Sequence, residues 1–335
     1  MKKHILSAVL LGLACFTALA ANYKVTVPFE DEEGATAVLV NFDTGEPVDS
    51  VKVTETGAVF QGVVDEPMAV RLVLDGAKLS SFILEEGDIQ VNPATRSITG
   101  GWLNQINNDI NAQMSEIGAK FQSAQTEAEQ DEIYSEYVKL MDSMLHENLN
   151  NPIGYLLFLD MAYEMAPAEL EKFVEENPYF KKFVRVNKLI EANRNKLATS
   201  EGQMFADFEI EYDGVKHRLS DVVGKGDYVL VDFWASWCGP CIRQTAVLKD
   251  IYKEYKDKGL KILGVAVWDE PENTKKAIEQ HELPWESWLN GQNVPTDVYG
   301  ISGIPCIILF GPDGNILSRD KQDAALKADV AKYVK

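Results

Sequence analysis

The chain has 335 residues, with 32 basic and 52 acidic side chains and a formal charge of −20. Such an acidic balance argues against nucleic acid as a partner, because a polyanionic backbone repels an acidic protein. Single hydrophobic cores stop growing at about 250–300 residues, so we expect two or three domains.

The first twenty residues, MKKHILSAVLLGLACFTALA, combine a two-lysine start, a short apolar stretch and a small-residue ending. This order predicts a secretory signal peptide that is cut after Ala20, and hence a periplasmic protein. Lipoprotein anchoring through Cys15 is the less favoured alternative, because Gly12 stands where a lipobox usually has leucine. No later stretch reaches the roughly 18 apolar residues of a membrane helix, so we expect no transmembrane segment in the mature chain.

Residues 21–100 alternate β-forming residues with turn signals, as in TAVLVNFDTGEPV, and predict a small antiparallel β domain. Asp43 to Gly45 lie where a hairpin turn is expected. Residues 101–199 change to a helical period, with Leu103, Ile110 and Phe121 on one predicted apolar face.

Residues 200–335 alternate strands with helices, which predicts an α/β sheet covered on both faces. The stretch DFWASWCGPCIRQ falls where the predicted strand 229–233 passes into a helix. Of the three cysteines that remain after signal cleavage, Cys238 and Cys241 form a C-x-x-C pair here, and Cys306 stands apart. An odd number leaves at least one thiol outside any intramolecular pairing.

The C-x-x-C pair has the features of a redox centre. Thiol-disulfide exchange requires a thiolate, and the N-terminus of a helix lowers the pKa of a thiol placed there. Pro240 suits the first turn of a helix, because the N–H that proline lacks would have no intrahelical partner there. We expect Gly239 to permit a tight turn into the helix. Cys238 would then be the exposed attacking thiol and Cys241 the protected resolving thiol.

Two other interpretations of the pair are less favoured. A structural disulfide gains little from closing so short a loop. A zinc site needs four ligands, and the histidines of the mature chain are scattered single residues: His146, His217 and His281.

Two further residues are candidates for the chemistry. Asp232 lies in the predicted strand VLVDF, where burial would raise its pKa towards that of a general base able to exchange a proton with Cys241; the alternative is an edge aspartate that faces water. Cys306 begins the apolar run CIILF. It is expected to be a packed, buried thiol, with participation in the redox chemistry as the alternative.

The segment VLVDFWASWCGPC resembles the active-site segment of thioredoxins. The segments GQMFADFEIEYDG, LPWESW and YGISGIPCIILFGPDGNIL resemble exported thioredoxin-like proteins of the TlpA/ResA type. Residues 21–199 more weakly resemble the β domain and helical extension of such proteins in Bacteroides-like bacteria. The resemblance implies a thioredoxin fold for residues 200–335.

The resemblance also implies roles for individual residues: Cys238 as the nucleophile, Cys241 as the resolving cysteine, Asp232 as the buried acid and Pro305 as a cis-proline that faces the cysteines. The neighbouring residues expected to contact a client are Trp237, Gly239, Pro240 and Ile304. The chain departs from the family's CxxExP pattern, because it has Gln244 and Ala246 where an acid and a proline are frequent.

These observations predict an exported thiol-disulfide oxidoreductase, working in the reducing direction on cysteine-containing client proteins. An N-terminal region would shape partner choice, and a membrane-embedded electron donor would return the pair to the reduced state. No cofactor is expected, because the cysteines carry the electrons. One alternative is a thiol peroxidase, although Ala235 stands where the peroxiredoxin Thr-x-x-Cys arrangement has threonine. The other is a non-catalytic binding module on a thioredoxin scaffold.

Overall fold

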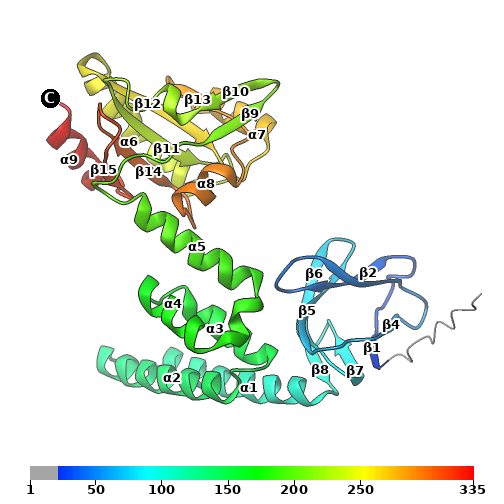
Figure 1. Ribbon diagram of the computed structural model, residues 1–335. Helices are drawn as coiled ribbons and strands as arrows, with labels where there is room; N and C mark the ends of the chain where they lie inside the picture. The colour runs from blue at the N-terminus through cyan, green and yellow to red at the C-terminus, as the bar shows by residue number, and fades with distance from the viewer. Residues whose placement is uncertain (1–21) are drawn as a thin grey trace, which may run out of the picture. The chain divides into compact units, whose positions relative to one another are not determined.

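The computed structural model describes residues 22–335; the predicted signal peptide, residues 1–20 with Cys15, lies outside the described residues. The described chain forms two compact units (Figure 1). The first runs up to Met165 and includes Val174–Arg185, and the second comprises Ala166–Phe173 and Val186–Lys335. The domain boundaries near residues 100 and 199 stay predictions, because a division into compact units does not by itself define domains.

The first unit begins with two four-stranded sheets, in the orders β4-β1-β7-β8 and β3-β2-β5-β6. All neighbours are antiparallel except β1 and β7, which are parallel. Alternate residues such as Val25, Leu39, Phe60 and Leu72 are buried in one shared core. The strands are β1 (Tyr23–Val27), β2 (Thr36–Asn41), β3 (Pro47–Lys52), β4 (Ala58–Gly62), β5 (Met68–Leu74), β6 (Ala77–Leu84), β7 (Gly87–Asn92) and β8 (Ser97–Thr99).

The predicted turn after β2 is present, and its aspartate has a structural role. The Asp43 carboxylate accepts hydrogen bonds from the Tyr155 hydroxyl at 2.7 Å and from the backbone N–H groups of Val184 at 2.7 Å and Arg185 at 2.9 Å. These two N–H groups open a helix and lack intrahelical partners, so Asp43 caps that helix.

Helices follow the strands, several of them with proline in the first turn as predicted. Leu103 and Ile110 are buried as expected, but Phe121 is exposed, so the predicted apolar face ends before the last turn of its helix. The helices are α1 (Trp102–Ser123), α2 (Glu127–Glu147), α3 (Pro152–Ala162), α4 (Pro167–Glu176), the 3-10 helix η1 (Pro178–Lys182) and α5 (Val184–Ala198).

The second unit has a five-stranded sheet in the order β13-β12-β11-β14-β15 and a separate hairpin of β9 and β10. Strands β11, β12 and β13 are parallel, whereas β14 and β15 are antiparallel to their neighbours. The elements are β9 (Glu209–Tyr212), β10 (Val215–Arg218), η2 (Leu219–Asp221), β11 (Tyr228–Trp234), α6 (Gly239–Tyr255), η3 (Lys256–Lys258), β12 (Leu260–Ala266), α7 (Pro271–Gln280), β13 (Glu286–Trp288), α8 (Val294–Tyr299), β14 (Cys306–Phe310), β15 (Ile316–Arg319) and α9 (Asp323–Tyr333).

Both faces of the five-stranded sheet are covered, which confirms the predicted α/β arrangement (Figure 1). On one face Leu230 of β11 packs with Leu248 of α6 and Leu326 of α9. On the other face Phe233 packs with Tyr299 of α8 and with the hairpin. Alternate residues of β11 therefore serve two different cores.

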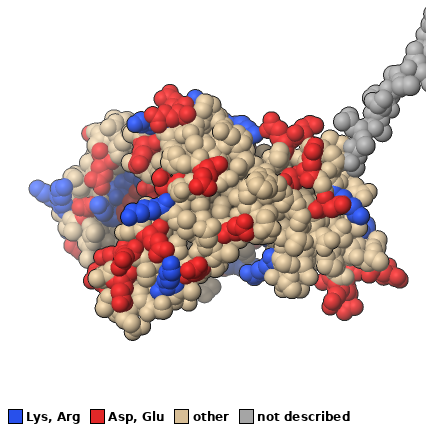
Figure 2. Space-filling model, turned by 90° about the horizontal axis from the view of Figure 1, so that it is seen from below, with Lys and Arg blue, Asp and Glu red and all other residues tan. Residues whose placement is uncertain are grey.

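Acidic side chains are spread over the face seen in Figure 2 and are interspersed with lysine and arginine. Within residues 22–335, none of the helices combines the length and apolarity that crossing a membrane requires.

Candidate active site

The cysteine pair lies at the start of α6, where β11 passes into that helix. Cys238 is the N-cap of α6, and its Sγ accepts a hydrogen bond from the Cys241 N–H at 3.1 Å. The two sulfurs form a disulfide. Unpaired N–H groups and the helix dipole favour negative charge at this end of a helix, so the fold stabilises a thiolate at Cys238 once the disulfide is reduced.

Pro240 occupies the first turn of α6, as expected. Gly239, however, is not required by the backbone. It does not have a positive φ, and a Cβ at this position would meet only the Arg243 guanidinium, at 3.7 Å. The turn into α6 therefore does not depend on glycine, and Gly239 is an open position on the exposed surface beside the disulfide.

Exposure of the two cysteines follows the expected order but not the expected degree. Cys238 is only 4% exposed and Cys241 is completely buried. The predicted exposed thiol is therefore nearly covered in the disulfide form, because Cys238 packs in a cluster with Trp234 and Ala277. Trp237, by contrast, is 61% exposed immediately before the pair.

A second loop reaches the cysteine pair from the start of β14. The Ile304–Pro305 peptide bond is cis, and both residues are half-buried. The Ile304 carbonyl oxygen lies 3.7 Å from the Cys238 Sγ. The Ile304–Pro305 loop therefore borders the Cys238 sulfur.

Asp232 is buried in the centre of the sheet, so the alternative of a water-facing edge aspartate is wrong. It is 2% exposed, and burial raises its pKa to about 7. Leu230 and Trp234, two residues to either side, pack with residues of α6, so Asp232 lies on the α6 face, as does Cys241. Its Oδ1 has no hydrogen-bond partner among the described residues.

The surroundings of Asp232 include a small polar cluster that sequence reasoning missed. Asp232 is paired with Gly264 on β12, and Gly264 with Ser287 on β13. The Ser287 Oγ and the Trp234 Nε1 lie 2.7 and 3.1 Å from the point where a Cβ of Gly264 would stand, and neither atom has a hydrogen-bond partner in residues 22–335. No lysine or arginine belongs to this cluster, so Asp232 becomes charged without a neighbouring cation.

Hydrogen bonds connect the loop after β12 to the loop between β11 and the cysteines. The buried Asp269 carboxylate accepts hydrogen bonds from the Ser236 N–H at 2.8 Å, the Ser236 hydroxyl at 2.9 Å and the Thr274 hydroxyl at 2.7 Å. The Trp237 indole N–H also donates to the Trp268 carbonyl oxygen at 2.9 Å. These long-range contacts had no signal in the local sequence, and they fix the position of Trp237 beside the disulfide.

Cys306 has the buried environment expected for a packed thiol. It pairs with Phe233 and shares the core on the face opposite to Cys241. Its thiol lies 3.1 Å from a carboxylate oxygen of Asp320, to which it donates a hydrogen bond. Burial, and then the Asp320 charge, raise the pKa of Cys306 well above its ordinary value.

Gln244, one of the departures from the family pattern, connects two helices. Its side chain is buried, and with its amide oxygen turned towards α9 it accepts from the Asp323 N–H at 3.1 Å and donates to the Asp323 carboxylate at 3.0 Å. This residue therefore joins α6 to the start of α9.

Residues 22–335 contain no group of three or more histidine, cysteine, aspartate and glutamate side chains that could hold a metal ion.

The sheet order, the helices on its two faces and the cysteine pair at the start of α6 are those of a thioredoxin-like oxidoreductase. The chain belongs to the family of ResA thiol-disulfide oxidoreductases. It is 31% identical over 122 residues to ResA of Geobacillus thermodenitrificans, a match that covers 36% of this chain and 69% of the relative. It is 28% identical over 123 residues to ResA of Bacillus subtilis, with 36% and 68% covered.

Two family models match separate parts of the chain. Residues 202–319 match the AhpC/TSA family, and residues 23–113 match a domain of unknown function, DUF4369. The thioredoxin domain of a thiol-disulfide oxidoreductase from Bacteroides vulgatus is 34% identical, with 41% of this chain and 99% of that chain covered and a TM-score of 0.36. A thiol:disulfide interchange protein from a Bacteroides species is 35% identical, with 41% and 91% covered and a TM-score of 0.37.

Proposed function

We propose that this oxidoreductase is exported to the periplasm and reduces disulfides of client proteins through Cys238 and Cys241. The observation that carries the proposal is the position of the pair at the N-terminus of α6, with the Cys241 N–H directed at the Cys238 Sγ. Export is supported by the signal-like sequence of residues 1–20.

The reaction begins with the reduced pair. The Cys238 thiolate attacks one sulfur of a client disulfide, forms a mixed disulfide and expels the other client sulfur as a thiolate, which takes a proton from water. Asp232, ionised, accepts the proton of Cys241. The Cys241 thiolate then attacks the Cys238 Sγ and expels the second client sulfur. Two electrons have passed to the client, and the Cys238–Cys241 disulfide has formed.

Client contact is assigned to the surface around the disulfide. Trp237 is exposed and held by Trp268, Gly239 and Pro240 are exposed on the first turn of α6, and Ile304 borders the sulfur. An open glycine at position 239 leaves room for a client backbone. Pro305 follows Ile304 in the same loop, and we assign it to the same contact surface.

The reducing direction is proposed from Gly239 and Pro240 between the cysteines and from the acid at position 232, and it requires a source of electrons. A reductant in the oxidising periplasm must be reduced again after each turnover. We therefore include in the proposal a membrane-embedded electron donor that returns the disulfide to two thiols.

A thiol peroxidase is the alternative from the sequence, and the AhpC/TSA match covers the cysteine pair without distinguishing it from a thiol-disulfide oxidoreductase. A peroxidase would oxidise a cysteine to a sulfenic acid with peroxide, whereas the reductase exchanges disulfides without peroxide. The chain has Ala235 where the peroxidase motif has threonine.

Reduction of insulin with dithiothreitol as the electron source, run beside peroxide consumption, tests the proposal. The reductase accelerates insulin reduction and consumes no peroxide. Peroxide consumption without insulin reduction would support the peroxidase, and the absence of both activities would support a binding module.

A further inference from the structure

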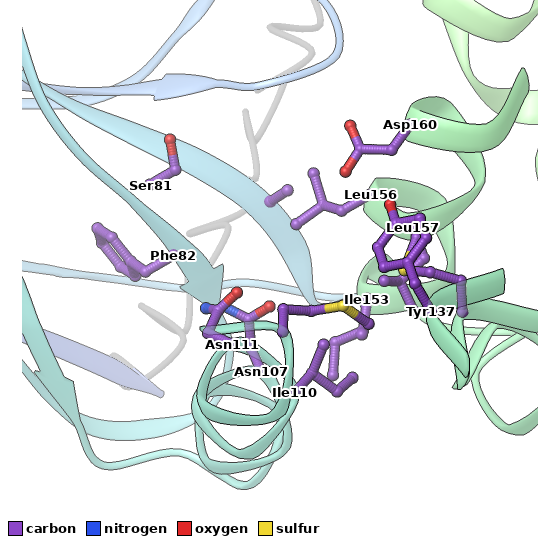
Figure 3. A pocket seen from close by; sticks show the side chains of 13 residues that line it. Ser81, Phe82, Asn107, Ile110, Asn111, Tyr137, Ile153, Leu156, Leu157 and Asp160 are labelled. Carbon is purple, nitrogen blue, oxygen red and sulfur yellow. The ribbon is translucent and has the colours of Figure 1, made fainter. Parts of the chain in front are cut away.

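The first unit contains a groove of about 460 Å³ between β6 and helices α1, α2 and α3 (Figure 3). This volume lies in the usual range of ligand sites, about 300–1,000 Å³. Its lining includes apolar side chains from the three helices, namely Ile110, Met141, Ile153 and Leu157. Polar groups also line it, namely Ser81, Asn107, Asn111, Tyr137 and Asp160.

One wall of the groove is formed by the last two strands of a sheet, by Ala69 of β5 and by Ser81 and Phe82 of the edge strand β6. Strand β6 ends the order β3-β2-β5-β6. At Ile83 the outward N–H donates to the Asn104 side-chain oxygen at 2.9 Å, and the outward carbonyl accepts from the Asn104 amide at 2.7 Å. This side chain therefore takes the place that a neighbouring strand would have at Ile83.

The next outward backbone groups of β6 belong to Ser81. Along an antiparallel strand, the backbone N–H and C=O groups of successive residues point alternately towards the partner strand and away from it. Ser81 lies two residues before Ile83, so its N–H and carbonyl also point away from β5. Neither group has a hydrogen-bond partner within the described residues. Ser81 lines the groove, so an unused donor and acceptor lie at its wall.

The opposite wall carries a negative charge. Figure 3 shows Asp160 on the helical side of the groove and Ser81 on the strand side. Lysine and arginine are absent from the described residues that line the groove. Partial burial raises the pKa of Asp160, and burial, followed by the Asp160 charge, raises the pKa of Tyr137.

We propose that this groove binds an extended peptide segment carrying a lysine or arginine, which adds to β6 as a further strand. The proposal rests on the proposed function, because client proteins supply such segments. The segment's backbone pairs with the free groups of Ser81, and alternate side chains enter the apolar floor. Its cationic side chain pairs with Asp160, and the exposed Asn111 amide is available to a segment backbone.

The first test measures binding with the full-length oxidised protein. The probe is a short, fluorescein-labelled, cysteine-free peptide of alternating valine and threonine with a central lysine, and its matched control has glutamate in place of lysine. Anisotropy is expected to show the lysine peptide binding about fivefold more tightly than the glutamate peptide.

Variants assign that preference to the groove. Asp160→Asn should remove the fivefold preference, and Asp160→Glu should retain it. Asp109→Asn is the matched control, because Asp109 is an exposed acid of α1 outside the groove. Equal binding of the two peptides to the unmodified protein, or a preference that survives Asp160→Asn, would overturn the cation-binding role.

The second test is amide hydrogen exchange at Ser81. Saturation with the lysine peptide should slow exchange of the Ser81 N–H at least about tenfold, because a new strand covers it. Ser81→Pro removes that donor at an edge-strand position that tolerates proline, and should weaken binding about tenfold. Unchanged exchange at Ser81 in the bound protein overturns strand addition.

The probe contains no cysteine, so its binding is independent of thiol chemistry. Insulin reduction without peptide binding would overturn only the proposal that the groove binds a peptide segment. Peptide binding without insulin reduction overturns the reductase and leaves the groove in place.

Discussion

Asp232 lies directly opposite Gly264 on the neighbouring strand, so its carboxyl group faces a position with no side chain. On the far side of Gly264, strand β13 places Ser287 opposite it, and the Trp234 indole also lies beside Gly264. Burial without a cation accounts for the pKa of about 7, far above the ordinary 3.8. Two predictions depend on this pKa.

The first prediction concerns stability and pH. The unfolded chain loses the Asp232 proton near pH 3.8, and the folded chain only near pH 7. Between these values the folded state binds more protons, so Asp232 makes stability fall as pH rises from about 4 to about 7, with no further loss above. Asp232→Asn should therefore raise the free energy of unfolding at pH 8 by about 2–4 kcal/mol and have little effect at pH 4.

Guanidinium unfolding of the oxidised protein, followed by tryptophan fluorescence at both pH values, measures this effect. Asp109→Asn, which removes an exposed acid, is the control. An equal increase in the free energy of unfolding at pH 4 and pH 8 would contradict a buried Asp232 with a raised pKa.

The second prediction concerns the rate of client release. Asp232→Asn should slow attack by Cys241 on the mixed disulfide about 10- to 100-fold at pH 7, since a general base contributes on that order or more. The effect should shrink towards pH 9, because hydroxide can then take the Cys241 proton. Stopped-flow measurement of insulin reduction across this range decides the matter, and an unchanged pH–rate profile would refute the role of Asp232.

The third prediction concerns Cys306, on the sheet face opposite to Cys241. Because its pKa is raised and its thiol is buried, Cys306→Ala should leave the turnover and the redox potential nearly unchanged. Alkylation of the native reduced protein should label Cys238 well before Cys306. Comparable labelling rates, or a Cys238–Cys306 disulfide found by peptide mapping, would place Cys306 in the chemistry.

The fourth prediction concerns the redox potential. With Gly239 and Pro240 between the cysteines, we expect a reducing value near that of thioredoxin, about −270 mV, and not the value near −120 mV of a strong oxidant. Equilibration with glutathione buffers gives this potential. A value above about −180 mV is incompatible with a reductase.

Much of the site was predictable because its signals are local. The apolar strand before the cysteines, the proline in the first turn of α6 and the burial of Asp232 all follow from neighbouring residues. Local reasoning was wrong where it judged side chains without their surroundings. Phe121, predicted to lie on the apolar face of its helix, is exposed near the end of α1.

The unpredicted features depend on strand register and loop packing. Gly264 and Ser287 are distant from Asp232 in sequence and meet it only because three parallel strands pair in one register. Asp269 similarly holds Ser236 across a large sequence separation. Register and loop position are set by the whole core, so a single sequence pattern does not predict them.

The fifth prediction concerns the roles of the two cysteines. In Cys241→Ser, Cys238 can still attack a client disulfide, but no thiol remains to resolve the product. Cys238→Ser lacks the thiol at the helix start, and the remaining Cys241 is completely buried. Only the first variant should therefore accumulate mixed disulfides.

Non-reducing gel analysis of both variants with a disulfide-containing client protein is the most direct measurement of this chemistry. We expect a higher-mass band with Cys241→Ser that disappears on reduction, and no such band with Cys238→Ser. A band with Cys238→Ser alone would reverse the two roles, and the absence of a band from both variants would contradict disulfide exchange through this pair.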